Sequence, residues 1–288
     1  MFKKRIWAYI GITCGWLIAL GGVVVLMSFI EQKKADVLCR DVKVYIPGNE
    51  YFIDKQEIDN IVNAKYLIGR TLDGINIHAL EARLKANPFV QSARVFEDMD
   101  GVIEVEISQR KPILRILNQN NADYYVDEHG LKVPLSENFT AMVLVANGFI
   151  EEPFDGRVDT LHTDIAKAIY KTADYIRKDS LWAAQIAEIY VNQQQEIELI
   201  PRVGNQRILL GDADSLDNKF HNLYIFYKKA LPQAGWGTYK AINIKYANQV
   251  IGVKNQLTKQ DSIAAKQAAA AKLDSTQQMV KDTSQISN

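Results

Sequence analysis

The stretch NPFVQSARVFEDMDGVIEVEISQRKP, residues 87–112, decides the fold because the hydrophobic period changes within it. Apolar and polar residues alternate over 93–95 and again over 103–108, a pattern typical of strands with one buried face. Asp100-Gly101 lies between the two segments, and this pair tolerates the positive φ of a tight hairpin turn. The stretch therefore predicts an antiparallel hairpin that follows a helix ending at Asn87, before Pro88.

Upstream of the hairpin the pattern predicts one strand and two helices. Residues 42–46 alternate and end at Pro47-Gly48, as a strand entering a turn does. Asp54 and Glu57 form a capping-box pattern, in which Asp54 caps a first helix and Glu57 reaches back to it. A second helix begins near Asn76. Two helices over one face of a three-stranded sheet leave no room in about 70 residues for a cleft with its own chemistry.

Downstream, Pro112 marks a joint to a longer unit of short strands and helices. A meander of strands is predicted at 113–117, 124–126, 131–135 and 141–146, followed by a helix at 161–178. Further strands are predicted at 186–191, 196–200 and 206–210, then a helix capped by Ser215 and stopped by Pro232, then strands at 242–246 and 250–254. The fold class is thus α+β, with a mostly antiparallel second domain that carries at least two helices. The polar, alanine-rich tail 255–288 is predicted to be disordered.

Residues 6–30 carry no formal charge and are long enough to cross a membrane as one helix. A cleavable signal peptide is the alternative, but its apolar region is usually only about 7 to 15 residues long. Basic residues flank both sides almost equally, so the short N-terminus, rather than the charge, favours a cytoplasmic residue 1. Gly11, Gly15, Ala19 and Gly22 follow a small-residue spacing that predicts a contact with another membrane helix.

Composition excludes several kinds of partner and site. The 34 basic and 34 acidic residues cancel, so the chain has no net basic field for nucleic acid. Cys14 lies within the apolar run, where Cys39 cannot reach it, and no intrachain disulfide is expected. The four histidines fall on separate elements without metal-ligand spacing, and no nucleophile elbow, phosphate loop or Cys-x-x-Cys motif occurs. We therefore predict no catalytic, cofactor-binding or metal-binding residues.

The last predicted strand, residues 249–254, indicates a different kind of site. Only the polar tail follows it, so its outer edge is free to pair with an extended segment of another protein. Two alternatives remain open: the strand is paired on both sides, or Lys245 and Lys254 blunt its edge.

Three segments together resemble the bacterial cell-division protein FtsQ (DivIB) family. They are residues 87–95 continuing through 103–112, the sequence YVDEHG at 125–130, and the sequence INIKY at 242–246. The resemblance implies a POTRA domain, the family's β domain and a non-enzymatic scaffold in the divisome that joins FtsB and FtsL at the septum. It also implies that the last strands receive a strand of FtsB, which places the contact at Tyr246, Gln249, Val250, Ile251, Gly252 and Val253. Where the family commonly has an Asp and an Arg, this chain has Asn243 and Lys245, so the resemblance does not carry over any ion pair made by those two positions.

The expected organisation follows from these features. A cytoplasmic segment 1–5, a transmembrane helix 6–30 in the inner membrane and a linker 31–38 precede a periplasmic POTRA-like domain at 39–110. The FtsQ-type β domain occupies 111–254, and the tail 255–288. A membrane-anchored peptidoglycan hydrolase remains an alternative, because paired carboxylates leave no spacing signature. A POTRA-bearing export factor is the other alternative, but it would be expected to carry tandem POTRA repeats or a barrel-forming stretch, and neither occurs.

Overall fold

The computed structural model describes residues 15–25, 27, 37–48, 52–98, 100–246 and 248–255. These residues divide into two compact units. The first unit comprises the described residues up to Leu144 together with Glu151–Tyr170, and the second comprises Val145–Ile150 and the described residues from Lys171 onward.

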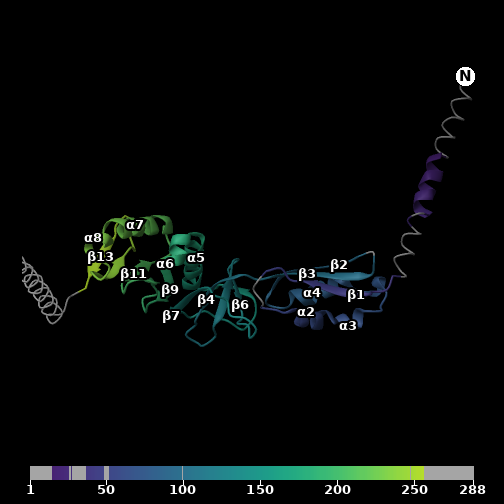
Figure 1. Ribbon diagram of the computed structural model, residues 1–288, viewed down its shortest axis with the longest axis horizontal. Coiled ribbons are helices and arrows are strands. Elements are labelled where there is room, and N and C mark those ends of the chain that lie inside the picture. Colours follow the sequence, from purple (N-terminus) through teal and green to yellow (C-terminus); the bar gives the residue numbers. More distant parts are fainter. Residues whose placement is uncertain are drawn as a thin grey trace, which may run out of the picture. The chain divides into compact units, whose positions relative to one another are not determined.

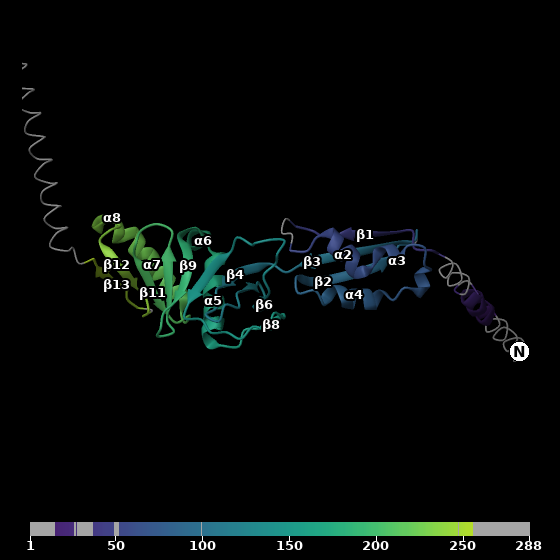
Figure 2. The ribbon, with the colours of Figure 1, turned by 90° about the horizontal axis from the view of Figure 1, so that it is seen from below.

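The first unit begins with a small sheet covered by helices. The strands β1 (Asp41–Tyr45), β2 (Val90–Glu97) and β3 (Val102–Gln109) lie in the order β1-β3-β2, with β1 parallel and β2 antiparallel to β3. The helices α2 (Lys55–Val62), α3 (Ala64–Leu67) and α4 (Ile77–Lys85) lie along one face of this sheet, with the 3₁₀ turn η1 (Leu72–Gly74) between α3 and α4 (Figures 1 and 2). Ile103, Val105 and Ile107 are buried with the apolar helix residues in one core, so the predicted order of strand, helix, helix, strand, strand is confirmed.

The hairpin between β2 and β3 requires a glycine at residue 101. Gly101 has φ of +82°, in the left-handed region that the sequence predicted for this turn. A Cβ atom at this position would also lie 2.4 Å from the carbonyl oxygen of Leu38. The turn is therefore packed against the segment that leads into β1.

The predicted cap at Asp54 and the predicted helix start near Asn76 are confirmed, but the predicted capping box is wrong in one half. Asp54 Oδ1 accepts the Glu57 N–H at 2.7 Å, and Asn76 Oδ1 accepts the Ala79 N–H at 2.9 Å. The Glu57 carboxylate does not return to Asp54, because it accepts a hydrogen bond from Asn87 Nδ2 at 3.0 Å. Glu57 thus links α2 to the turn after α4, a contact between residues 30 positions apart. The short elements α3 and η1 span too few residues to leave a period in the sequence.

The strands β4 (Pro112–Ile116), β5 (Tyr124–Asp127), β6 (Leu131–Val133) and β8 (Asp159–Thr160) also belong to the first unit. They pair antiparallel in that order, which confirms the start of the predicted meander. Pro112 is the first residue of β4, where its missing N–H is tolerated.

Arg110 connects the small sheet to β5 and the turn that follows it. Its Nη1 lies 2.9 Å from Asp127 Oδ2, and its Nε donates to the Pro88 carbonyl at 3.0 Å. The other oxygen of the buried Asp127 carboxylate accepts the N–H groups of His129 and Leu131, each at 2.9 Å. Pro88, Arg110 and Asp127 come from the segments 87–95, 103–112 and 125–130, which carry the family resemblance. These three segments therefore meet at one joint.

An aromatic cluster packs at the same joint. Phe52 stacks on Phe89 with ring centroids 5.7 Å apart and meets Tyr125 and Phe139 edge-on at 6.0 Å and 5.0 Å. These rings come from the segment before α2, the turn before β2, strand β5 and the loop after β6. Their packing adds apolar contact to the Arg110 ion pair.

Replacing Arg110 by alanine should lower the free energy of unfolding by about 3 kcal/mol, because Asp127 would remain buried without its cationic partner. The urea midpoint of the purified chain measures this effect. Arg94→Ala is the matched control, since Arg94 pairs with Glu106 at the surface and its loss should cost less than about 1 kcal/mol. Equal urea midpoints for the two variants would show that the Arg110–Asp127 ion pair stabilises the fold no more than a surface ion pair does.

The second unit contains the strands β7 (Leu144–Gly148), β9 (Ile186–Val191), β10 (Ile197–Pro201), β11 (Arg207–Gly211), β12 (Tyr239–Asn243) and β13 (Ile251–Lys254) as neighbours in that order. The pairs β7–β9 and β11–β12 are parallel, and the others are antiparallel. The inclusion of 141–146 in the meander is therefore wrong. The chain between β7 and β9 forms a crossover through α5 (Asp164–Lys178) and α6 (Ser180–Gln185), which parallel pairing requires.

The helices α7 (Leu216–Lys229) and α8 (Leu231–Ala234) follow β11 (Figure 1). Ser215 stands at the start of α7, but the predicted side-chain cap is wrong: Ser215 has φ of +50° and makes no capping hydrogen bond. Pro232 does not stop α7 either, because α7 ends at Lys229 and Pro232 lies in the first turn of α8, where proline fits.

The two ends of the predicted organisation fall mostly outside the described residues. Residues 15–25 are helical with exposed side chains, and the remainder of the predicted span 6–30, apart from residue 27, is not described. In the part of the chain that the structure describes, no helix has both the length and the apolar character needed to span a membrane. Of the predicted tail 255–288, the structure describes only Asn255.

Candidate partner-binding edge

Strand β13 is the outermost strand of the second unit. It pairs antiparallel with β12, with Asn243 opposite Ile251, Ile242 opposite Gly252 and Ala241 opposite Val253. Among the described residues no other strand pairs with β13, so the alternative of a strand paired on both sides is not what the structure has. Because N–H and C=O groups alternate in direction along a strand, every second residue of β13 directs its backbone groups away from β12. This outward row is a template for one further strand.

The six predicted contact residues lie together in and just before this strand. Tyr246 and Gln249 belong to the turn between β12 and β13, where the Gln249 N–H donates to the Tyr246 carbonyl at 3.3 Å. Val250 precedes the strand, and Ile251, Gly252 and Val253 lie within it. Tyr246 is 59% exposed and Ile251 44% exposed, so two large apolar side chains stand open at the edge.

Gly252 lets an aromatic ring lie across the strand. A Cβ atom on Gly252 would come within 2.5 Å of the Tyr239 ring, too close to be tolerated without movement of that ring. Tyr239 in turn meets the ring of Phe226, from α7, edge-on at 5.3 Å. The sequence did not reveal Tyr239 or Phe226 as part of the site, because they stand 13 positions apart and acquire a common role only when α7 packs beside β12.

Asn255 fixes the far end of β13. Its N–H donates to the Thr238 carbonyl at 2.9 Å, and its Nδ2 donates to the Gly237 carbonyl at 2.9 Å. The strand is therefore held to its neighbour at both ends, by the Tyr246–Gln249 turn and by Asn255.

Lys245 and Asn243 are each engaged, although not with one another as an ion pair. Lys245 Nζ pairs with Glu196 at the turn between β9 and β10, and Asn243 Oδ1 accepts the Lys245 N–H at 2.9 Å. The hydrogen bond from Lys245 is the main reason that the pKa of Glu196 lies below its usual value. Lys245 is thus held toward Glu196, which answers the alternative that it blunts the edge, whereas Lys254 stays exposed on β13.

The proposed helix contact is only partly described. Gly15, Ala19 and Gly22 lie in the helical stretch 15–25, and apart from the backbone of this helix and the adjacent residues, no described heavy atom lies within 4 Å of the Cβ position at Gly15 or Gly22. Gly11 lies outside the described residues.

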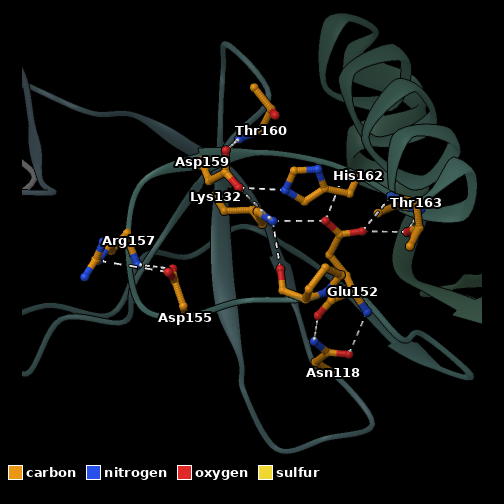
Figure 3. A network of polar contacts seen from close by, with 11 residues as sticks. Asn118, Lys132, Glu152, Asp155, Arg157, Asp159, Thr160, His162 and Thr163 are labelled. Carbon is orange, nitrogen blue, oxygen red and sulfur yellow. Dashed lines mark hydrogen bonds and ion pairs between the residues drawn. The ribbon is translucent and has the colours of Figure 1, made fainter.

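A buried polar network in the first unit brings the carboxylates of Glu152 and Asp159 to the same lysine, Lys132 (Figure 3). Lys132 on β6 donates to Glu152 Oε1 at 3.0 Å, and both side chains are almost fully buried. Glu152 also accepts the N–H groups of His162 and Thr163, each at 2.8 Å, and the Thr163 hydroxyl at 2.6 Å. Asp159 lies 2.6 Å from His162 Nε2 and 3.7 Å from Lys132 Nζ.

This network holds structure together rather than presenting a reactive group. Burial opposes ionisation of Glu152, but the hydrogen bonds from Thr163, His162 and Lys132 outweigh it and hold the pKa of the carboxyl below its usual value. Both Glu152 oxygens are already occupied, and Thr163 caps the start of α5. Within the described ranges, no cluster of three or more His, Cys, Asp or Glu side chains could hold a metal ion.

Two family models match the chain. Residues 37–108 match the POTRA-like domain, and residues 111–253 match the domain described as FtsQ/DivIB, C-terminal related. No curated protein matches the chain as a whole or in part. The boundary between the two matches falls at Arg110, the residue that joins the small sheet to β5. A POTRA-like domain followed directly by the FtsQ/DivIB C-terminal-related domain shows that the chain belongs to the FtsQ/DivIB family of non-enzymatic cell-division proteins.

Proposed function

We propose that this chain is a single-pass membrane scaffold of the divisome that captures a partner by adding the partner's strand to β13. The observation that carries the proposal is the open edge of β13, which is held in place at both ends, with exposed Tyr246 in the turn before it and exposed Ile251 within it. Backbone hydrogen bonds along such an edge supply affinity, and the side chains on either face supply selectivity.

Residues 6–30 form the anchor in this proposal, with the N-terminus in the cytoplasm and both domains in the periplasm at the septum. The support is the length of the uncharged run and the position of both family domains on its C-terminal side. Gly11, Gly15, Ala19 and Gly22 would form a secondary contact with a partner's membrane helix.

The proposed partners are FtsB and FtsL. Membership of the FtsQ/DivIB family supports division proteins as partners in general, and the edge at Gln249–Lys254 supports an extended segment as the form in which one of them binds. The balanced charge of the chain supports a role in which neither nucleic acid nor a metal cation is bound.

The test is co-purification of the tagged full chain from native membranes. We expect FtsB- and FtsL-type proteins to be recovered with the full chain, and to be lost when residues 249–254 are deleted. Recovery of the same proteins with the deletion variant would contradict capture at β13. Purified protein should also fail to turn over peptidoglycan, and measurable turnover would favour the hydrolase instead.

A further inference from the structure

Exposed apolar and basic side chains gather where the first unit begins. Leu38 lies opposite Thr71 in an antiparallel bridge, and Cys39 exchanges backbone hydrogen bonds of 2.7 Å with Gly69 and Arg70. The segment before β1 is thereby joined to the segment after α3, at one end of the small sheet (Figures 1 and 2). We call the side chains of Leu38, Lys65, Tyr66, Ile68 and Arg70 the α3 patch.

The apolar side chains of the α3 patch are about half exposed to solvent. Leu38 is 50% exposed, Tyr66 56% and Ile68 49%. Arg70 lies over the Tyr66 ring with its guanidinium carbon 3.8 Å from the centroid, which keeps a cation and an aromatic ring together at the surface. Aromatic rings beside Lys and Arg are the combination favoured at the interface between a membrane and water.

The short segment between the predicted membrane span and Leu38 limits the distance between the α3 patch and the membrane. Only residues 31–37 separate Leu38 from the end of the predicted span at Ile30. Seven residues reach at most about 25 Å when fully extended. A surface tethered this closely has a high effective concentration at the bilayer, so contacts too weak for a free protein suffice.

We propose that the α3 patch docks on the anionic surface of the membrane that holds the anchor. Tyr66, Ile68 and Leu38 enter the headgroup boundary, and Lys65 and Arg70 face the lipid phosphates. Docking orients the POTRA-like domain against the bilayer. This inference rests on the anchor of the proposed function, but it does not depend on β-augmentation.

The test uses the full chain, with Cys14 replaced by serine, in nanodiscs of three parts phosphatidylcholine to one part phosphatidylglycerol. An environment-sensitive fluorophore is attached through Thr71→Cys, beside Leu38, or through Lys85→Cys as the control. Leu38 contacts Gly101, at the end of the sheet where the hairpin turns. Lys85 is the last residue of α4 and lies near the start of β2, at the other end of the sheet. The control position is therefore far from the α3 patch. Lipids that carry a quencher near the headgroup then report contact.

We expect severalfold stronger quenching at residue 71 than at residue 85, and loss of the difference in a variant with Tyr66→Ser and Ile68→Asp. Quenching at residue 71 should weaken severalfold when phosphatidylglycerol is omitted, since Lys65 and Arg70 then lose their attraction to anionic headgroups. Equal quenching at the two positions in a chain that has inserted would overturn docking while leaving the anchor intact. A chain that does not insert would overturn both docking and the proposed anchor.

Discussion

Proline at one of two adjacent positions, Val250 or Ile251, should abolish partner capture while leaving the fold unchanged. Proline removes a backbone N–H, and consecutive residues of a strand direct their N–H groups to opposite sides. One of the two variants therefore removes an outward donor that a partner strand needs. The other removes the donor that faces β12 and should weaken the β12–β13 pair itself. Co-purification from membranes, together with thermal unfolding, separates the two effects.

Ile251→Thr is the matched control for these variants. Threonine keeps the backbone N–H and the β-branched shape that strands favour, so capture should persist. If neither proline variant reduced capture, or if Ile251→Thr reduced it as much as proline does, recognition by backbone pairing would be wrong. A loss of at least tenfold in affinity is expected for the outward variant, since about 1.4 kcal/mol accounts for each factor of ten.

Replacing Glu152 by glutamine, or Lys132 by methionine, should lower the free energy of unfolding by about 3–5 kcal/mol. Either change leaves a buried group of the ion pair without its partner, which costs more than the pair itself contributes. The double variant should recover much of the loss, because no uncompensated charge remains. Urea unfolding of the wild type, the two single variants and the double variant measures the coupling energy between Glu152 and Lys132. If the loss in the double variant equalled the sum of the two single losses, this coupling would be absent.

The same pair gives a pH dependence with a definite sign. The pKa of Glu152 is lowered in the folded chain, so its ionised form stabilises the fold above the unfolded pKa of about 4.3. This contribution is lost as the pH falls through the lower, folded pKa. The difference in stability between the wild-type chain and Glu152→Gln should therefore shrink below about pH 4, and a constant difference would contradict the assignment.

Local patterns were enough to predict the small sheet. The alternation at 103–108, the Asp100-Gly101 turn, the cap at Asp54 and the helix start near Asn76 act over a few residues, and the structure confirms each of them. The strands β4, β5 and β6 were found in the same way, from short apolar runs between turn formers.

Contacts between distant residues could not be predicted in that way. Glu57 pairs with Asn87 instead of its own helix start, and β7 pairs with β9 across an intervening pair of helices. Lys132 and Glu152 are ordinary surface-type residues until the fold buries them together. At the candidate site, the edge position of β13 followed from its place before a polar tail, whereas the rings of Tyr239 and Phe226 emerged only from packing.

The central claim is that a partner's extended segment lies beside β13, and photocrosslinking in native membranes tests it most directly. A photoreactive phenylalanine analogue is placed at Ile251, and at fully exposed Met142 as the control. Capture at β13 predicts one dominant adduct from residue 251, joined to an extended segment of an FtsB-type division protein, and none to that segment from residue 142. Absence of this adduct at residue 251, with the same protein still recovered from the membrane, would contradict the claim.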